Sequence, residues 1–242
     1  MLYCSVLFST VLAGLVQSVT GFGAGVVMLM VFPYFLDMLH APALSTAIVV
    51  GSAASIAWKF RKQIDFRLVL PMAAIYLSMS TAMIVLAKQL DLDLLTMAFG
   101  IFLIVLSVYY LKFSKSITLR PTLTTTVLCA VVSGICGGLF GIGGPLLALY
   151  YLATSKGKQA YIANIQTTFF ITNTVNTITR ICNGIYTLDL FPLTLLGLAG
   201  ISVGNFFGLR ILDRINIDRM RTAIYIFIGI SGVLNVLEYV FP

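Results

Sequence analysis

The length of its uninterrupted apolar runs is the feature that most constrains this chain. A transmembrane helix needs about 20 consecutive apolar residues, whereas a strand of an outer-membrane barrel alternates in polarity over about ten. The runs here are continuous, and hydrophobic residues make up 60% of the 242. The sequence therefore predicts an all-α polytopic membrane protein. The apolar runs are Leu2–Leu36, Ala41–Trp58, Leu68–Ala87, Leu94–Leu111, Leu123–Ala153, Ile162–Thr179, Leu190–Leu209 and Ala223–Phe241.

The loops between these runs are short, so we expect one membrane domain over residues 1–242 and no separate soluble domain. The first run could be taken for a signal peptide. A signal peptide, however, begins with a basic segment and ends at a small-residue cleavage site. We find neither in the first run and expect it to remain part of the folded protein.

An internal repeat divides the sequence into two halves, residues 1–120 and 121–242. At a shift of 120 residues, GLVQSVTGFGAGV (14–26) aligns with GICGGLFGIGGPL (134–146), and three glycines coincide. Internal repeats of this kind recur in secondary transporters. A shift of 121 aligns further polar residues: Ser45 with Gln166, Ser52 with Asn173, Ser55 with Asn176 and Lys59 with Arg180.

The first run of each half is too long for one membrane crossing. Leu2–Leu36 would extend roughly 52 Å as a straight helix, against a hydrocarbon core of about 30 Å. Its glycines lie near its middle, where a chain reversal would fall, and GLFGIGGPLL (138–147) repeats the pattern in the second half. We therefore expect each half to consist of a glycine-broken hairpin followed by three transmembrane helices.

The distribution of basic residues favours these hairpins. If each long run crossed the membrane once, the fifteen Lys and Arg residues would divide eight to seven between the two sides. With hairpins, all of them except Lys88 and Arg180 lie on one side, which the positive-inside rule makes cytoplasmic. The two repeats are then inverted relative to each other, both termini are external, and the protein lies in the cytoplasmic membrane.

The two glycine turns, GFGAG (21–25) and GIGGP (141–145), are candidate anion sites. Each precedes an apolar helical run, and helix N-termini present free N–H groups and a partial positive charge. If a two-fold axis in the membrane plane relates the halves, the turns meet near the midplane. The alternative is that these glycines only allow close packing of helices.

The segment after the second turn, NIQTTFFITNTVNTITR (164–180), is unusually polar for a membrane span. Gln166, Asn173, Asn176 and Arg180 follow one another at helical spacing, which places them on one face. Such a face could line a permeation cavity, or its amides could simply bond neighbouring helices. Arg180 could orient an oxyanion, or it could anchor the helix at the lipid headgroups.

The lack of several residue patterns limits the classes of function that the chain can have. All eight acidic residues lie at or near the ends of the apolar runs, so no buried carboxylate for proton or sodium coupling is evident. The four cysteines form no C-x-x-C pair, and the chain has one histidine and no H-E-x-x-H motif. We therefore expect no metal, no disulfide, no cofactor and no enzymatic activity.

Two motifs carry a resemblance to a known family. The glycine turns that open the halves, and the loop TSKGKQA followed by the polar segment ANIQTTFFITNTVNTITR, resemble the TauE/SafE sulfite exporter family. Members of that family are thought to move small sulfur-containing anions, sulfite or organosulfonates, across the cytoplasmic membrane. The resemblance implies these substrate-site residues: Gly141, Gly143, Gly144, Pro145, Gln166, Asn173, Asn176 and Arg180, with Gly21, Gly23, Ser52 and Ser55 from the first half.

The sequence is thus interpreted as that of a secondary transporter that works by alternating access of one repeat against the other. An anion channel and a structural subunit of a larger membrane complex stay open as alternatives. The expected partners are a small sulfur-containing anion and the lipid bilayer, with no nucleic acid. Whether the chain forms a homo-oligomer stays open.

Overall fold

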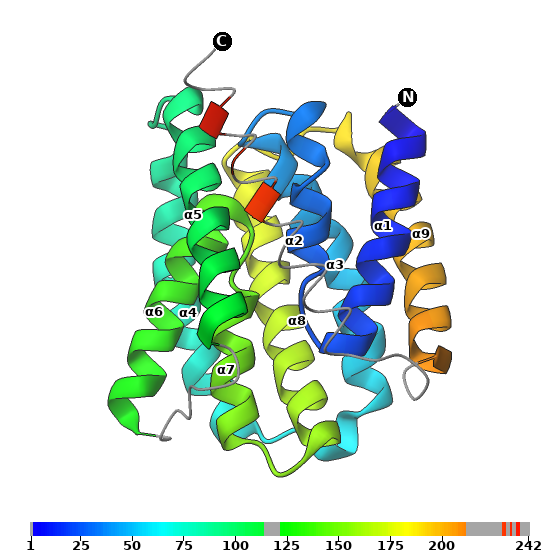
Figure 1. The fold of residues 1–242 in the computed structure, drawn as a ribbon, viewed down its shortest axis with the longest axis vertical. Helices are drawn as coiled ribbons and strands as arrows, with labels where there is room; N and C mark the ends of the chain where they lie inside the picture. The colour runs from blue at the N-terminus through cyan, green and yellow to red at the C-terminus, as the bar shows by residue number, and fades with distance from the viewer. Residues whose placement is uncertain (1, 114–121, 212–228, 231–232, 234–235, 238–242) are drawn as a thin grey trace.

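The computed structural model describes residues 2–113, 122–211, 229–230, 233 and 236–237, and in these residues the secondary structure is helical without strands. Six of the helices are long and apolar enough to cross a membrane, so the all-α membrane prediction is confirmed. They are α1 (Leu2–Thr20), α3 (His40–Lys59), α4 (Phe66–Ala87), α5 (Leu92–Phe113), α6 (Leu123–Phe140) and α9 (Leu190–Ile211) (Figure 1). The expected run Ala223–Phe241 lies largely outside the described residues.

Each of the two longest apolar runs is divided at its glycines. The helix α1 is followed by the short α2 (Ala24–Leu29) and the 3₁₀ turn η1 (Phe32–Tyr34), and α6 by the short α7 (Gly144–Thr154). The φ angles of Gly21, Gly23 and Gly141 are 83°, 101° and 71°. This left-handed region carries little steric penalty only for glycine. The helix breakers therefore turn the chain.

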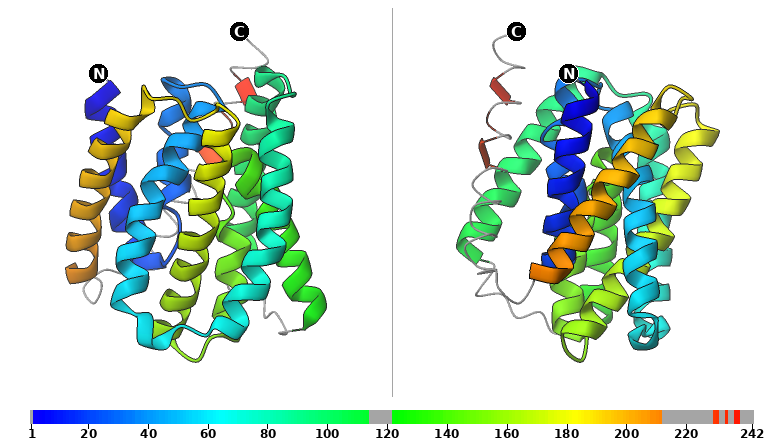
Figure 2. Two further views of the ribbon diagram at one scale, coloured as in Figure 1. Left: turned by 180° about the vertical axis from the view of Figure 1, so that it is seen from behind. Right: turned by 90° about the vertical axis from the view of Figure 1, so that its right-hand side faces the viewer.

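The helix α8 (Lys158–Cys182) packs between α3 and α4 and carries more buried polar side chains than any other helix that the structure describes. It packs against α3 and α4, while α3 also packs against α9 (Figures 1 and 2). The outer helices pair as α1 with α9 and α4 with α6. Its buried polar side chains are tolerated because protein rather than lipid surrounds them, and the large exposed side chains of α8, Phe170, Ile178 and Ile181, are apolar.

Glycines set the distance between the outer helix pairs. A Cβ on Gly14 or Gly204 would overlap the backbone of the facing helix in the α1–α9 pair. A Cβ on Gly134 would lie 2.6 Å from the carbonyl oxygen of Tyr76 in the α4–α6 pair. These contacts follow the small-residue packing known for membrane helices. For these glycines, close packing is therefore the role that the structure supports.

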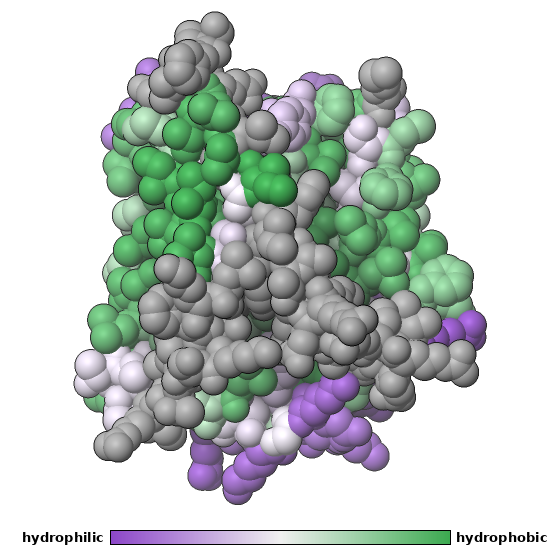
Figure 3. Space-filling view, in the orientation of Figure 1, coloured by the Kyte–Doolittle hydropathy of each residue, from purple (hydrophilic) through white to green (hydrophobic). Residues whose placement is uncertain are grey.

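Charged residues gather at the two ends of the bundle. The loop that contains η2 (Arg61–Gln63) meets the start of α8, where the Asp65 amide donates to Asn164 Oδ1 at 2.8 Å. At the opposite end, Lys88 Nζ donates to the carbonyl oxygen of Asn183 at 2.7 Å. Figure 3 shows an apolar belt above a hydrophilic lower end, as expected for a bundle that crosses a membrane.

The loop before α3 is fixed by a local capping interaction. Asp37 Oδ1 accepts from the amides of Leu39 and His40 at 2.9 Å, and Asp37 Oδ2 lies 2.7 Å from His40 Nδ1. Partial burial opposes the carboxylate, but these hydrogen bonds outweigh it and lower the pKa of Asp37 below 3.8. The Asp37 carboxylate therefore places a negative charge at the start of α3.

Candidate functional site

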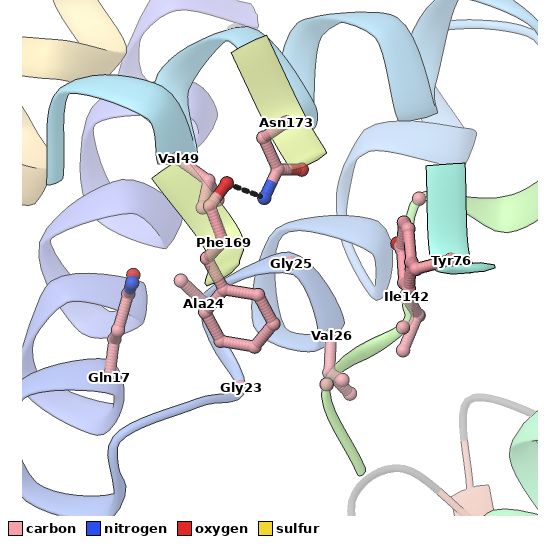
Figure 4. Close-up of a pocket in the computed structure, with 13 residues that line it drawn as sticks. Gln17, Gly23, Ala24, Gly25, Val26, Val49, Tyr76, Ile142, Phe169 and Asn173 are labelled. Atoms are coloured by element: carbon pink, nitrogen blue, oxygen red, sulfur yellow. Dashed lines mark hydrogen bonds between the residues drawn. The ribbon is translucent and has the colours of Figure 1, made fainter. Parts of the chain in front are cut away.

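A small cavity lies where the two glycine turns meet. The cavity volume is about 30 Å³, which is room for about two water molecules at 10–15 Å³ each. Its walls come from α1, α2, α3, α4, α8 and the turn before α7 (Figure 4). The lining residues are Gln17, Gly23, Ala24, Gly25, Val26, Val49, Tyr76, Gly141, Ile142, Gly143, Gly144, Phe169 and Asn173.

The two turns touch each other, although they are about half the chain apart in sequence. A Cβ on Gly25 would lie 3.2 Å from the carbonyl oxygen of Gly141, and a Cβ on Gly144 would lie 3.3 Å from Cβ of Phe22. Gly25 consequently faces the backbone of the second turn, whereas Gly144 packs against the side chain of Phe22 in the first turn. Only glycine permits so close an approach of backbone to backbone or to a ligand.

The residues at the start of α2 line the cavity. The first hydrogen bond of α2 runs from the Val27 amide to the Gly23 carbonyl at 3.0 Å. The amides of the three preceding residues therefore have no acceptor within the helix. At the start of α7, Pro145 occupies a position whose N–H would have no helical partner in any case.

Asn173 is the polar side chain of α8 that reaches the cavity. It is 7% exposed, and its Nδ2 donates to the carbonyl oxygen of Phe169 at 2.8 Å (Figure 4). A side-chain amide nitrogen carries two N–H groups, so one stays available beside this bond. Tyr76 contributes an aromatic wall from α4.

A buried chain of hydrogen bonds holds the first turn in place. It runs from Asn205 Nδ2 to Ser52 Oγ at 2.7 Å, and from Ser52 Oγ to Gln17 Oε1 at 3.2 Å. It continues from Gln17 Nε2 to Gln166 Oε1 at 3.0 Å, and from Gln166 Nε2 to the Gly21 carbonyl at 2.9 Å. Four helices, α9, α3, α1 and α8, are joined through it. Ser52 and Gln166, which the sequence suggested as substrate ligands, are engaged in this positioning chain.

Asn176 and Arg180 are fully buried but do not line the cavity. Arg180 Nη2 donates to the carbonyl oxygen of Gly138 at 2.7 Å, and Asn176 Oδ1 accepts from Ser80 Oγ at 2.8 Å. Both contacts lie at the junction of α4, α6 and α8. Arg180 therefore does not reach the lipid headgroups, which was the alternative drawn from the sequence.

The structure thus brings five of the twelve suggested site residues to the cavity: Gly23, Gly141, Gly143, Gly144 and Asn173. Gly21 and Pro145 belong to the two turns but do not line the cavity. Ser55 is exposed, and its Oγ donates to the carbonyl oxygen of Ser52 in its own helix.

Sequence reasoning missed Gln17, Tyr76 and Asn205. Gln17 carried a signal, because it is a long amide within GLVQSVTGFGAG, four residues before the first glycine of the turn. Tyr76 and Asn205 lie in ordinary apolar segments, and only the fold brings them to the site.

Within the described residues, no three His, Cys, Asp or Glu side chains lie close enough to hold a metal ion. The cysteines Cys4, Cys129, Cys136 and Cys182 are free thiols. The chemistry of the described interior is therefore carried by amides, hydroxyls, backbone N–H groups and one guanidinium.

The fold and the cavity define a multi-pass membrane protein whose interior is polar at the meeting point of two broken helices. A family model described as "Sulfite exporter TauE/SafE" matches residues 6–234. The chain belongs to this TauE/SafE family and is a membrane transporter. It is 25% identical over 247 aligned positions to a probable membrane transporter protein of Methanocaldococcus jannaschii, covering 93% of this chain and 92% of that protein. No solved structure matches the chain.

Proposed function

We propose that the protein carries a small sulfur-containing anion, sulfite or an organosulfonate, across the cytoplasmic membrane by alternating access. The observation that carries this proposal is the contact between the two glycine turns around one cavity. Family membership supports the substrate class, since the family model is described as a sulfite exporter. The described residues that line the cavity include no carboxylate, which supports an anion over a cation.

The binding chemistry follows from the lining. The unpaired N–H groups at the start of α2, the second N–H of Asn173 Nδ2 and the Tyr76 hydroxyl are donors near the cavity. An oxyanion offers acceptors for such donors and is favoured at helix N-termini. Among the described residues, no acidic side chain lines the cavity to repel it.

Inverted repeats over residues 1–120 and 121–242 are part of the proposal. Helix α1 runs parallel to α9, with Gly14 against Gly204, and α6 runs parallel to α4, with Gly134 against Tyr76. If the halves correspond, α1 is equivalent to α6 and α9 is equivalent to α4. The α1–α9 pair and the α4–α6 pair are then equivalent contacts, and each joins a helix of the first repeat to a helix of the second. The antiparallel packing of α3 and α8 around the centre also fits such a two-fold axis.

Alternating access would consist of rocking one repeat against the other around the turns. The cavity, at about 30 Å³, is small, so the turns must separate for an anion to enter. The basic loops at the η2 end of the bundle would face the cytoplasm. The N-terminus, and with it the Lys88 end, would be external.

The proposed roles differ among the residues suggested by the sequence. Gly23, Gly141, Gly143, Gly144 and Asn173 contact the substrate in this scheme. Gly21, Pro145, Ser52 and Gln166 shape and hold the turns, and Ser55 is at the periphery.

Flux into proteoliposomes tests the function. Purified protein should give saturable uptake of one among sulfite, thiosulfate, taurine and sulfoacetate, with sulfate and chloride as comparison anions. Asn173→Ala should depress that flux at least tenfold, whereas Asn183→Ala, at the far end of α8, should leave it within twofold. Unsaturable flux would favour a channel. Absence of flux of every anion, from protein shown to be folded and inserted, would refute the proposal in favour of a structural subunit.

A further inference from the structure

The guanidinium of Arg180 is a buried charge without a counter-charge. Among the Lys and Arg side chains that the structure describes, it alone is buried, with 0% exposed. Its Nη2 bonds the carbonyl oxygen of Gly138, but Nε and Nη1 have no partner among the described residues. A buried ion in this condition is strongly unfavourable unless something pairs with it.

The described acidic residues cannot supply that partner. The ion pair that the structure records within the described ranges joins His40 and Asp37 at the end of the bundle. The described acids are all exposed and lie near helix ends: Asp37, Asp65, Asp91, Asp93 and Asp189. No carboxylate among the described residues therefore offsets the charge of Arg180.

A second unpartnered donor lies beside Arg180. Asn176, also 0% exposed, precedes Arg180 by one turn of α8, and its Nδ2 has no partner in the part of the chain that the structure describes. Its Oδ1 is occupied by Ser80 Oγ, so the nitrogen is the free side of the amide. The Ser80 backbone in turn packs directly on Gly138, because a Cβ there would lie 2.5 Å from the Ser80 carbonyl oxygen. Arg180 and Asn176 thus both present N–H donors at this junction that have no partner among the described residues.

This donor cluster adjoins the cavity. Arg180 follows Asn173 by seven residues, which is about 10 Å along the axis of α8. Tyr76 connects the two places, since it lines the cavity and its hydroxyl lies against Gly137, next to the Gly138 carbonyl that accepts from Arg180. Ionisable groups buried inside a membrane protein commonly mark the pathway of an ion.

We propose that Arg180 and Asn176 form a second anion-binding site, next to the cavity and toward the Lys88 end of the bundle. The planar guanidinium offers two adjacent donors to an oxyanion, and the Asn176 amide offers a third. The ligand class, a small oxyanion such as sulfite, rests on the proposed function. The site would hold the anion before or after its passage between the glycine turns.

A purely structural role for Arg180 makes a different prediction. The carbonyl of Gly138 lies in the last turn of α6, where a cation is favourable without any ligand. If capping were its whole role, Arg180→Gln would lower the melting temperature but leave anion binding unchanged.

Equilibrium binding of radiolabelled sulfite to the purified full-length protein separates these roles. We expect two bound anions per chain in the wild type and one in Arg180→Gln, with Arg180→Lys retaining weakened second-site binding. Asn176→Leu should weaken the same site at least tenfold. Lys88→Gln, an exposed cation at the same end, is the matched control and should bind as the wild type does.

The inference is overturned if Arg180→Gln binds as many anions as the wild type with affinities within twofold. It is equally overturned if the folded wild type binds no sulfite. Binding that depends on Arg180 in a protein that shows no flux would refute the proposed function alone. Flux with binding unaffected by Arg180→Gln would refute this inference alone.

Discussion

Gln166→Leu should destabilise the protein by about 2–4 kcal/mol. The substitution removes two buried hydrogen bonds and leaves the Gly21 carbonyl and Gln17 Nε2 without partners. Two buried unsatisfied groups at about 1–3 kcal/mol each give about 2–6 kcal/mol. Interhelical bonds measured in a membrane protein average only about 0.6 kcal/mol, or about 1.2 for two. The expected value lies between these limits, because Gln17 and Gln166 are at most 1% exposed and water cannot replace the lost bonds.

Titration with sodium dodecyl sulfate in mixed micelles, followed by circular dichroism, measures this change. The double variant Gln17→Leu/Gln166→Leu should cost at least about 1 kcal/mol less than the sum of the single variants, since neither partner is then left alone. Thr174→Val is the control on the same helix, because Thr174 Oγ1 bonds only the Phe170 carbonyl. A loss below about 1 kcal/mol for Gln166→Leu, with additive single changes, would refute the reasoning.

Three further predictions concern topology, packing and pH. In a cysteine-free background, Lys62→Cys should react with an impermeant maleimide only from inside, and Asn183→Cys, which aligns with Lys62 at the shift of 121, only from outside. Labelling of both from the same side would contradict the inverted arrangement. Gly137→Ala should destabilise the protein by about 1–3 kcal/mol in the same titration, because a Cβ would overlap the Tyr76 hydroxyl; a change near zero would mean that the α4–α6 contact adjusts freely. The pKa of Asp37 is lowered from 3.8, so its stabilisation is present above this value and is lost as the pH falls through the folded-state pKa. The melting temperature should therefore fall between pH 5 and pH 3 less steeply in Asp37→Asn than in the wild type.

Much of the fold follows from the sequence because bilayer dimensions leave few choices. A run such as Leu2–Leu36 is too long for one crossing, and glycines at its centre leave a break as the simplest outcome. The structure has that break at Gly21–Gly23 and again at Gly141–Gly143. Membrane class, helical fold and family are confirmed. The inverted repeat and the orientation of the termini stay predictions. The first concerns the structural equivalence of the two halves, and the second concerns the side of the membrane on which the termini lie.

The site was harder to predict because one residue type serves several purposes in the interior. Gln166 and Asn173 lie on the same face of α8, yet the first completes a hydrogen-bond chain and the second reaches the cavity. Spacing along a helix gives the face but not the partner that another helix supplies. Tyr76 shows the converse, because an aromatic residue in an apolar run gives no sign of facing a polar cavity.

One pair of aligned positions in the two halves, Lys59 and Arg180, differs in burial, and this difference bears on the direction of transport. Lys59, which aligns with Arg180, is exposed at the end of α3, with its Nζ 5.8 Å from the centre of the Phe60 ring. Arg180 is instead fully buried. If the halves are inverted repeats, their helices are arranged symmetrically, but a buried positive charge, that of Arg180, lies on one side of the cavity only. An anion would then meet a cationic site on the Lys88 side of the turns and only backbone and amide donors between them. Such asymmetry lets the energy of the bound anion differ between the two access states, which a fully symmetric site could not achieve.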